Sequence, residues 1–338
     1  MSKYVGVDLH SNNNYIGIID QKGRTVFQKK NPNDLDTILK SLDPYKELIK
    51  GIVIESTFNW YWLVDGLMGS GYKVHLANTT AIQQYSGLKY TDDKSDALWL
   101  AEMLRLKILP EGYIYPKGTR GLRDLLRRRM QLVQHRTALY LSMKGMIHNW
   151  TGLRINRSDM KHLDSGDMEN IFSGVHERLS AQSLLEVIRV FNKEIIKIEK
   201  AVIPNVSLRE EFKQLLTVCG IGEILGITIM LETGDIRRFS EVGNYSSYCR
   251  CVSSKKLTNN KKKGSGNKKN GNKYLAWAYV EAAHYMQRYS PKAKSWYQRK
   301  ASKRGQIVAT KALSNKIARA CYYIMKDRTA YNPEKMFG

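Results

Sequence analysis

The sequence has few cysteines, and no two of them have the spacing of a metal-binding pair. None of its four cysteines belongs to a Cys-x-x-Cys motif, the arrangement that is typical of structural zinc sites. Cys249 and Cys251 are too close together to give zinc two comfortable ligands without a second pair. We therefore expect a chain with free thiols in a reduced compartment.

Long apolar runs are also missing. The sequence contains no run of about 18 apolar residues, the minimum for a transmembrane helix. The N-terminal stretch MSKYVGVDLH enters a strand pattern at once, without the apolar core of a signal peptide. We expect no membrane partner and a cytoplasmic location.

Acidic residues are scarce relative to basic ones. The 338 residues include 31 Asp and Glu against 55 Lys and Arg, which gives a formal charge of +24. Such an excess attracts polyanions, through counterion release if these are nucleic acids. An apolar content of 42% nevertheless allows one or two real cores. The protein is therefore expected to be folded and to bind nucleic acid.

Strand and helix patterns alternate through the first hundred residues. Three strand patterns separated by short polar turns predict a three-stranded meander. The apolar run Ile52-Val53-Ile54 indicates a strand that is covered on both faces. Residues 1–112 are therefore expected to form an α/β domain with a mixed sheet. Strands are expected at 4–10, 14–20, 23–30, 49–56 and 73–78, and helical segments at 33–42 and 59–71.

Proline is absent between Pro116 and Pro204, and two long helical patterns fill that interval. Their apolar residues recur at three- and four-residue steps, which predicts a helical hairpin or an oligomerising coiled coil over residues 113–205. Arg129 and Arg136 lie on the seam of the first helix, so its pairing is imperfect or its partner is anionic. After Pro204, a capping-box pattern at 207–210 predicts the start of a helical domain over residues 206–338.

Carboxylates occupy unusual positions in the α/β domain. Asp8 lies inside an apolar strand, Glu55 ends another, and Asp93 and Asp96 share one face of a predicted helix. Oxygen ligands of this kind suit Mg²⁺, and two such ions about 4 Å apart would hold a phosphodiester. The alternative is that Asp93 and Asp96 only cap a helix and that Glu55 is an ordinary residue at the end of a strand. His10 should point to the same side as Asp8, and we expect it to form a local hydrogen bond rather than to bind metal.

The carboxylates lie in the segments GVDLH (6–10), VIEST (53–57) and DDKSDALWLAEM (92–103). In this order the segments resemble the RuvC-like branch of the ribonuclease H superfamily, in particular the DEDD transposases of the insertion-sequence 110 class and the Piv-type DNA invertases. The resemblance implies a catalytic and metal-binding tetrad of Asp8, Glu55, Asp93 and Asp96. Asp92 competes for the third place, although the step to Asp96 favours Asp93. The resemblance also implies that the tetrad binds Mg²⁺, for which Mn²⁺ can substitute.

The segment Gly220-Ile221-Gly222 lies between two apolar helical patterns. This arrangement resembles a helix-hairpin-helix element, in which backbone N–H groups at a helix N-terminus meet a phosphate. A tight turn between two helices is the alternative. The same family carries a similar element at the start of its C-terminal transposase domain, so we expect Gly220 and Gly222 to contact nucleic acid.

The stretch LTNNKKKGSGNKKNGN (257–272) has the composition of a basic linker. It resembles the family segment that holds the nucleophilic serine, eleven or twelve residues before a K-x-G-N-x-x-L motif. Lys269 to Leu275 supply that motif here, and counting back eleven residues leads to Thr258. Either Thr258 replaces serine as the nucleophile, or a nearby serine such as Ser265 acts instead, or the chain is impaired.

Two basic regions are expected to contact nucleic-acid phosphates. One surrounds Thr258, and the other lies on the first long helix. The alternative for both is a solvated surface. The residues are Lys255, Lys256, Lys261, Lys262, Lys263, Lys268, Lys269 and Lys273 in the first region, and Arg127, Arg128 and Arg129 in the second.

The resemblance implies a DNA transposase or recombinase that acts on donor and target duplex DNA, with a structured guide RNA, as a homo-oligomer of two or four chains. Strands would be exchanged through a covalent link to the hydroxyl of Thr258. Because this residue and the carboxylates lie on separate domains, folding or oligomerisation must assemble the site. The alternatives are a RuvC-like nuclease that uses water and a non-catalytic nucleic-acid-binding relative. An actin-like ATPase is disfavoured, because no second glycine-rich phosphate loop follows GVDLH.

Overall fold

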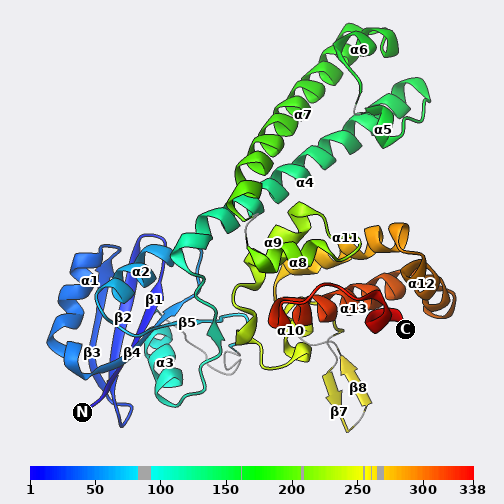
Figure 1. The fold of residues 1–338 in the computed structure, drawn as a ribbon. Coiled ribbons are helices and arrows are strands. Elements are labelled where there is room, and N and C mark those ends of the chain that lie inside the picture. The colour runs from blue at the N-terminus through cyan, green and yellow to red at the C-terminus, as the bar shows by residue number, and fades with distance from the viewer. Residues whose placement is uncertain (83–92, 161, 207–208, 254–255, 260, 265–269) are drawn as a thin grey trace. The chain divides into compact units, whose positions relative to one another are not determined.

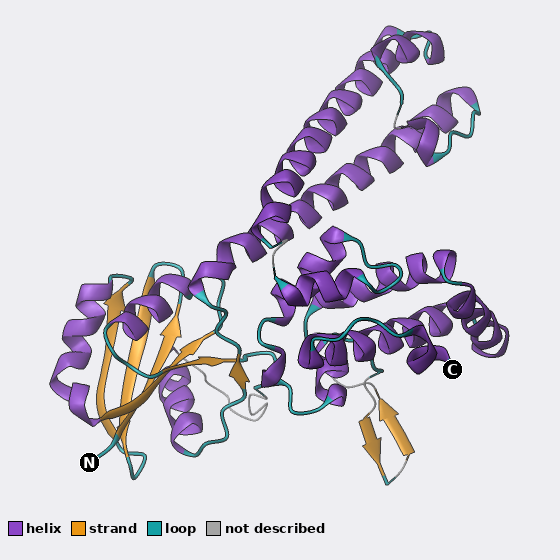
Figure 2. Cartoon of the chain, in the orientation of Figure 1, coloured by secondary structure: helices purple, strands orange, loops and turns teal. Residues whose placement is uncertain are grey.

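The computed structural model describes residues 1–82, 93–160, 162–206, 209–253, 256–259, 261–264 and 270–338. These residues form two compact units, Met1–Lys117 and Gly118–Gly338 (Figure 1). The first unit contains a large sheet, and the second is mostly helical (Figure 2). None of the helices in the described ranges is both long enough and apolar enough to span a membrane.

A mixed six-stranded sheet organises the first unit, in the order β3-β2-β1-β4-β5-β6. The predicted meander is confirmed, since β1 pairs antiparallel with β2 and β2 antiparallel with β3. Strands β1, β4 and β5 run parallel to one another, and β6 closes the edge in the antiparallel direction. The strands are β1 (Lys3–Leu9), β2 (Asn13–Asp20), β3 (Thr25–Pro32), β4 (Ile49–Glu55), β5 (Val74–Ala77) and β6 (Glu111–Gly112).

Helices cover the sheet on its two faces. Strand β1 sends Val5, Val7 and Leu9 into a core that it shares with α1 (Leu35–Leu42) and α2 (Tyr61–Gly69). The opposite face carries α3 (Asp93–Arg105), whose Leu100 and Met103 pack with Val53 of β4. A 3₁₀ helix, η1 (Asp43–Leu48), links α1 to β4. The alternation of side chains along β1 therefore leaves Gly6 and Asp8 for the α3 face.

The second unit begins with a long helical hairpin. Helices α4 (Lys117–Thr151) and α7 (Val175–Val202) are joined through the short helices α5 (Arg157–Met160) and α6 (Ser165–Ile171). Met143 and Ile147 of α4 pack with Ala181 and Leu185 of α7 in one apolar cluster. The arginines on the seam find polar partners on α7. Arg129 pairs with Glu199, and Arg136 donates to Asn192 Oδ1 at 2.7 Å.

The C-terminal part is helical, with one small β-hairpin that the sequence pattern does not predict. Its helices enclose a large core, to which α13 contributes Ala309, Leu313, Ile317 and Ile324. The elements are η2 (Ile203–Asn205), α8 (Glu210–Leu216), α9 (Glu223–Thr233), η3 (Ile236–Arg238), α10 (Val242–Tyr248), β7 (Lys256–Thr258), β8 (Lys261–Gly264), α11 (Lys273–Tyr289), α12 (Pro291–Arg304), α13 (Gln306–Asp327) and α14 (Pro333–Phe337).

The base of the hairpin shares the C-terminal core. Leu126 of α4 and Val202 of α7 belong to the same apolar cluster as Phe212 and Leu215 of α8. The domain limits 1–112, 113–205 and 206–338 stay a prediction. A helix begins near the predicted place, since α8 starts at Glu210 with Arg209 at the N-cap. Ser207 and Leu208 of the predicted capping box lie outside the described residues.

Candidate active site

The strand register brings two predicted carboxylates to one edge of the sheet. Strands β1 and β4 run parallel, and Val7 lies opposite Ile54. The next residues along each strand are Asp8 and Glu55, so both follow at the carboxyl end of the parallel pair. Both also lie on the α3 face, because their apolar neighbours fill the core on the other side.

Glycines let α3 approach this face closely. Gly6 of β1 lies opposite Gly17 of β2. A Cβ on Gly6 would lie 1.9 Å from the carbonyl oxygen of Ala97, and one on Gly17 would lie 2.9 Å from the Leu98 side chain. The glycine pair therefore lets α3 pack directly against the sheet. This packing places the first turn of the helix, with Asp93, above the end of β1.

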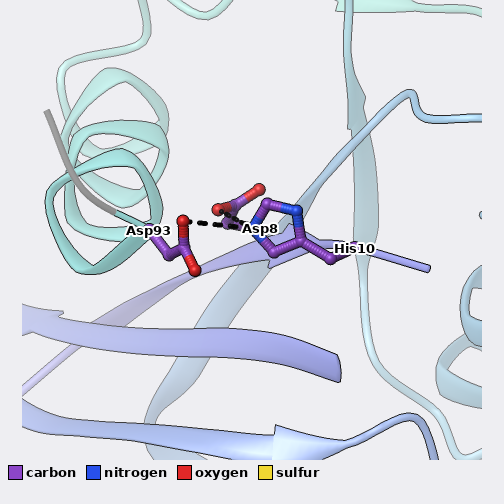
Figure 3. A group of neighbouring side chains, drawn as sticks. All are labelled: Asp8, His10 and Asp93. Carbon is purple, nitrogen blue, oxygen red and sulfur yellow. Dashed lines mark ion pairs between the residues drawn. The ribbon is translucent and has the colours of Figure 1, made fainter. Parts of the chain in front are cut away.

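Asp8, His10 and Asp93 meet at this point (Figure 3). His10 Nε2 lies 3.0 Å from Asp8 Oδ2 and 3.3 Å from Asp93 Oδ1. One nitrogen or oxygen atom from each of the three side chains lies within 4.8 Å of the others. The Asp8 side chain is only 3% exposed, whereas that of Asp93 is 48% exposed. The group therefore opens to solvent on the helix side.

Glu55 completes the acidic cluster. Its burial, a hydrogen bond with Asp8 and the charges of Asp8 and Asp96 raise the pKa of Glu55 to about 7, while His10 acts in the opposite direction. Near neutral pH a proton is thus retained among carboxyl groups that repel one another. A divalent cation can take the place of that proton, and carboxylate oxygens are the ligands that Mg²⁺ prefers. The residues present fit such an ion.

The structure therefore gathers Asp8, Glu55, Asp93 and Asp96 from β1, β4 and α3, and it adds His10. Asp92, the competitor for the third place, lies outside the described residues. His10 was expected to make a local hydrogen bond. It contacts Asp8, two residues away, and also Asp93, which is distant in the sequence. The metal-binding and catalytic roles of the four carboxylates stay predictions.

Thr258 ends strand β7, next to the turn of the β-hairpin in the second unit. It is exposed, it lies opposite Lys261 of β8, and Asn259 beside it has a φ of 48°, a left-handed value common in tight hairpin turns. The expected polar loop is thus partly a β-hairpin. Lys261 and Lys263 are exposed. Lys255, Ser265, Lys268 and Lys269 lie outside the described residues, and only the backbone of Lys256 and Lys262 is described.

The K-x-G-N-x-x-L motif has a clear structural basis at its centre. Gly271 has a φ of +88°, and a Cβ there would lie 2.6 Å from the carbonyl oxygen of Tyr248. Asn272 caps α11 by accepting from the N–H groups of Tyr274 and Leu275, and it donates to Glu232 Oε2 at 2.7 Å. The motif thus fixes the start of α11, and the Lys273 side chain lies exposed in its first turn.

Glu232 is a buried acid that the sequence patterns did not single out. Its carboxylate accepts from Arg123 Nε at 3.1 Å and from Arg127 Nη2 at 2.8 Å, besides Asn272. Burial alone would raise the pKa of Glu232, but the hydrogen bond from Arg127 and the charges of Arg123 and Arg127 lower it below its usual range. The available signal was an acidic residue directly after the run ILGITIML of α9, at a position that continues the buried part of the helix.

The three consecutive arginines have different partners within the second unit, and these bonds do not test their predicted contact with nucleic acid. Arg127 joins Glu232 and lies over the ring of Tyr274, with its guanidinium carbon 4.3 Å from the ring centre. Arg129 joins Glu199. Successive residues point about 100° apart around a helix, so each arginine meets different surroundings. Arg128 is exposed and bonds Gln131, and a role in nucleic-acid binding stays a prediction for it.

The glycine turn between α8 and α9 also has a packing role. Gly220 has a φ of +90°, and a Cβ there would lie 2.6 Å from backbone atoms of Ala282 and Met286 in α11. Gly222 is the N-cap of α9, and its Cβ position is open. The predicted contact between these backbone N–H groups and phosphate is not tested by this packing.

Comparison with known proteins finds family models that match two separate parts of the chain. A family model for the IS110 DEDD transposases, described as a transposase, matches residues 5–149, and a second model, described as the transposase IS116/IS110/IS902 family, matches residues 213–298. A probable family 20 transposase of Pseudomonas aeruginosa is 23% identical over 284 residues, which cover 81% of this chain and 82% of that protein. The first match contains the acidic cluster and the second contains the β-hairpin and α11. The chain therefore belongs to the IS110 family of DEDD transposases and is a DNA transposase.

Proposed function

We propose that the chain is an RNA-guided DNA recombinase with a RuvC-like first unit. It exchanges strands through a covalent link to Thr258, and Mg²⁺ or Mn²⁺ is held by Asp8, Glu55, Asp93 and Asp96. The single observation that carries the proposal is the cluster itself. Acids from three separate elements gather at one sheet edge, where burial, a hydrogen bond with Asp8 and the charges of Asp8 and Asp96 raise the pKa of Glu55 to about 7. A protein gains nothing in stability from that arrangement, so a ligand is the reason we infer for it.

The four carboxylates would contribute to metal binding in different ways. A divalent ion, when bound, would neutralise charge on a phosphodiester oxygen and orient the phosphate. Asp8 is held rigid by burial, and Glu55 would give up its proton as it becomes a ligand. Asp93 and Asp96 would supply oxygens from the first turn of α3.

Thr258 would act as the nucleophile in the second unit. Its Oγ1 would form a bond to phosphorus while the bond from phosphorus to the oxygen of the departing strand breaks. One strand end would then be attached to the protein, and the threonine proton would pass to the departing oxygen, which leaves as a free hydroxyl. The exposed position of Thr258 beside a turn allows a DNA backbone to approach. Lys261 lies opposite on the neighbouring strand, where its charge would favour the phosphate.

The proposed partners are donor and target duplex DNA, a structured guide RNA and further copies of the chain. Exposed basic residues at Arg128, Lys263 and Lys273 support contacts with phosphates. For self-association, support comes from α7, which exposes Leu179, Val190 and other apolar side chains although its opposite face is already packed. An apolar stripe of this kind on a paired helix favours a dimer or tetramer.

The proposal is tested by trapping the covalent link. The substrate is a duplex with the joined ends of the element that encodes the chain, nicked near the cleavage site, together with the RNA transcribed from that element and Mg²⁺. Wild-type protein is expected to give an adduct that survives denaturing electrophoresis, and mass spectrometry is expected to find the DNA on Thr258. Thr258→Ser should retain the adduct, whereas Thr258→Ala and Asp96→Asn should lose it. Ser253→Ala, which removes an exposed hydroxyl nearby, is the matched control and should behave as wild type.

Other outcomes have specific meanings. A peptide that carries DNA on Ser265 would transfer the nucleophile role to that residue. Cleavage by Thr258→Ala without an adduct, combined with no cleavage by Asp96→Asn, would indicate a nuclease that uses water. Tight binding without cleavage by any form would indicate a non-catalytic relative. Light scattering of the purified protein tests the oligomer, and a monomer with and without nucleic acid would refute that part.

A further inference from the structure

His10 occupies a position that a metal ligand would need. It follows Asp8 by two residues on the same face of the sheet, and its Nε2 atom is the one that faces the two carboxylates (Figure 3). The separations of 3.0 Å and 3.3 Å from the oxygens of Asp8 and Asp93 resemble those of neighbouring ligands around one ion. For an octahedral ion with bonds of about 2.1 Å, adjacent ligand atoms lie about 3 Å apart.

The backbone at His10 is held more firmly than its exposed position requires. Its N–H donates to the carbonyl oxygen of Asn13 at 2.9 Å. Its own carbonyl oxygen accepts from the side-chain amides of Asn33, at 2.9 Å, and Asn59, at 3.0 Å. The two asparagines that bind the carbonyl oxygen come from the segments after β3 and β4, far away in the sequence. They hold the His10 backbone in place, whereas the imidazole, with 44% of the side chain exposed, is held by its contacts with Asp8 and Asp93.

The anchors also connect His10 to the segment that follows Glu55. Asn59, which holds the His10 carbonyl, accepts through its Oδ1 from the Thr57 hydroxyl at 2.9 Å. The Thr57 N–H in turn donates to the Glu55 carbonyl oxygen at 2.9 Å. The backbones of His10 and Glu55 are therefore linked by one chain of hydrogen bonds, as expected for residues that hold one ligand.

We propose that His10 is a direct ligand, through Nε2, of a divalent ion that Asp8 and Asp93 also bind, and that this nitrogen makes the site favour Mn²⁺ over Mg²⁺. The inference rests on the proposed function, whose metal site it extends. Mg²⁺ prefers oxygen ligands and retains several waters, whereas imidazole suits first-row transition metals. A site of carboxylates alone would lack this bias. The histidine therefore determines the choice of metal.

The test is electron paramagnetic resonance of Mn²⁺ added to the full-length protein, without nucleic acid. Electron spin echoes of the bound Mn²⁺ are expected to show modulation from a coordinated ¹⁴N nucleus. Protein labelled with ¹⁵N-histidine should change that modulation to the ¹⁵N pattern, which identifies a histidine without any substitution. His10→Gln should abolish the modulation and weaken Mn²⁺ binding by about tenfold or more, with a smaller effect on Mg²⁺ binding measured by competition.

The matched control is His75→Gln in the same unit. His75 also lies beside a carboxylate, with Nδ1 3.0 Å from Glu111 Oε1, but it does not belong to the cluster. This variant should retain the nitrogen modulation and the preference for Mn²⁺. Circular dichroism establishes that each variant is folded, and the labelling experiment keeps the proposal testable if His10→Gln is not.

The possible failures are distinguishable. Bound Mn²⁺ without nitrogen modulation in the wild type would overturn the inference and leave the carboxylate site standing, since His10 would then only donate a hydrogen bond. Modulation that persists in His10→Gln, or an unchanged ratio of Mn²⁺ to Mg²⁺ affinity, would also overturn it. Failure to bind either ion would overturn both this inference and the metal site of the proposed function.

Discussion

Replacing Glu232 with glutamine should destabilise the second unit strongly. The Glu232 side chain is 3% exposed, and its carboxylate joins α4, through Arg123 and Arg127, to the N-cap of α11. The substitution preserves the shape but removes the charge that faces two guanidinium groups, one of which, on Arg123, is only 9% exposed. Removing one partner from a buried ion pair costs about 3–5 kcal/mol. Because glutamine retains one acceptor oxygen, we expect about 3 kcal/mol.

The assay is urea unfolding of the full chain, followed by far-UV circular dichroism and tryptophan fluorescence. Trp277 lines the same small cavity as Glu232 and reports locally. The matched control is Glu186→Gln, which discharges an exposed pair with Arg189 on α7 and should cost well under about 1 kcal/mol. If Glu232→Gln costs no more than Glu186→Gln, the charge of the buried carboxylate contributes no net stability.

The same carboxylate should also give a defined dependence on pH. Its pKa is lowered in the folded state, so its contribution to stability is fully present above the unfolded value of about 4.3 and is lost as pH falls through the folded value. The wild type should therefore lose its advantage over Glu232→Gln in acid. An advantage that grows as pH falls below about 4 would have the wrong sign and would refute the assignment.

Three further predictions concern other sites. Gly6→Ala should lower the urea midpoint of the first unit, because its Cβ would lie 1.9 Å from the Ala97 carbonyl oxygen, whereas Gly69→Ala, with nothing within 4 Å, should be neutral or stabilising; equal midpoints would contradict the close packing. In metal-free protein, stability should fall as pH rises through the raised Glu55 pKa of about 7, and Glu55→Gln should flatten that slope; an unchanged slope assigns the titration elsewhere. Iodoacetamide should label Cys219 first in the native protein, since the other thiols are buried; faster labelling of those thiols, located by peptide mass spectrometry, would contradict their burial.

The acidic cluster could be predicted from the sequence because local periodicities place its members. Alternation along β1 and β4 fixes the face on which Asp8 and Glu55 lie, and a three-residue step puts Asp93 and Asp96 on one side of α3. The contact of His10 with Asp93 was out of reach. It depends on how closely α3 approaches the sheet, and a sequence pattern contains no distance between elements.

The β-hairpin was missed because its composition resembles a disordered segment. Strand β8 consists of three lysines and a glycine, residue types that are depleted in strands. What indicates the turn is Asn259, since asparagine tolerates the left-handed conformation that it adopts there. The same two-residue connection explains why Thr258 lies opposite Lys261. Local turn chemistry was therefore a better guide than strand propensity.

The three arginines of α4 show how charge in a sequence differs from charge at a surface. Arg127 and Arg129 are balanced by Glu232 and Glu199, so the run adds less to the positive surface than its composition suggests. The K-x-G-N-x-x-L motif acts in the same network, because Asn272 binds the carboxylate that holds Arg127. The motif is thus a structural anchor for the chain that follows the nucleophile segment. Thr258 was located by counting eleven residues back from this motif. The predicted position of the nucleophile is therefore counted from a motif whose centre is held in place by the surrounding structure.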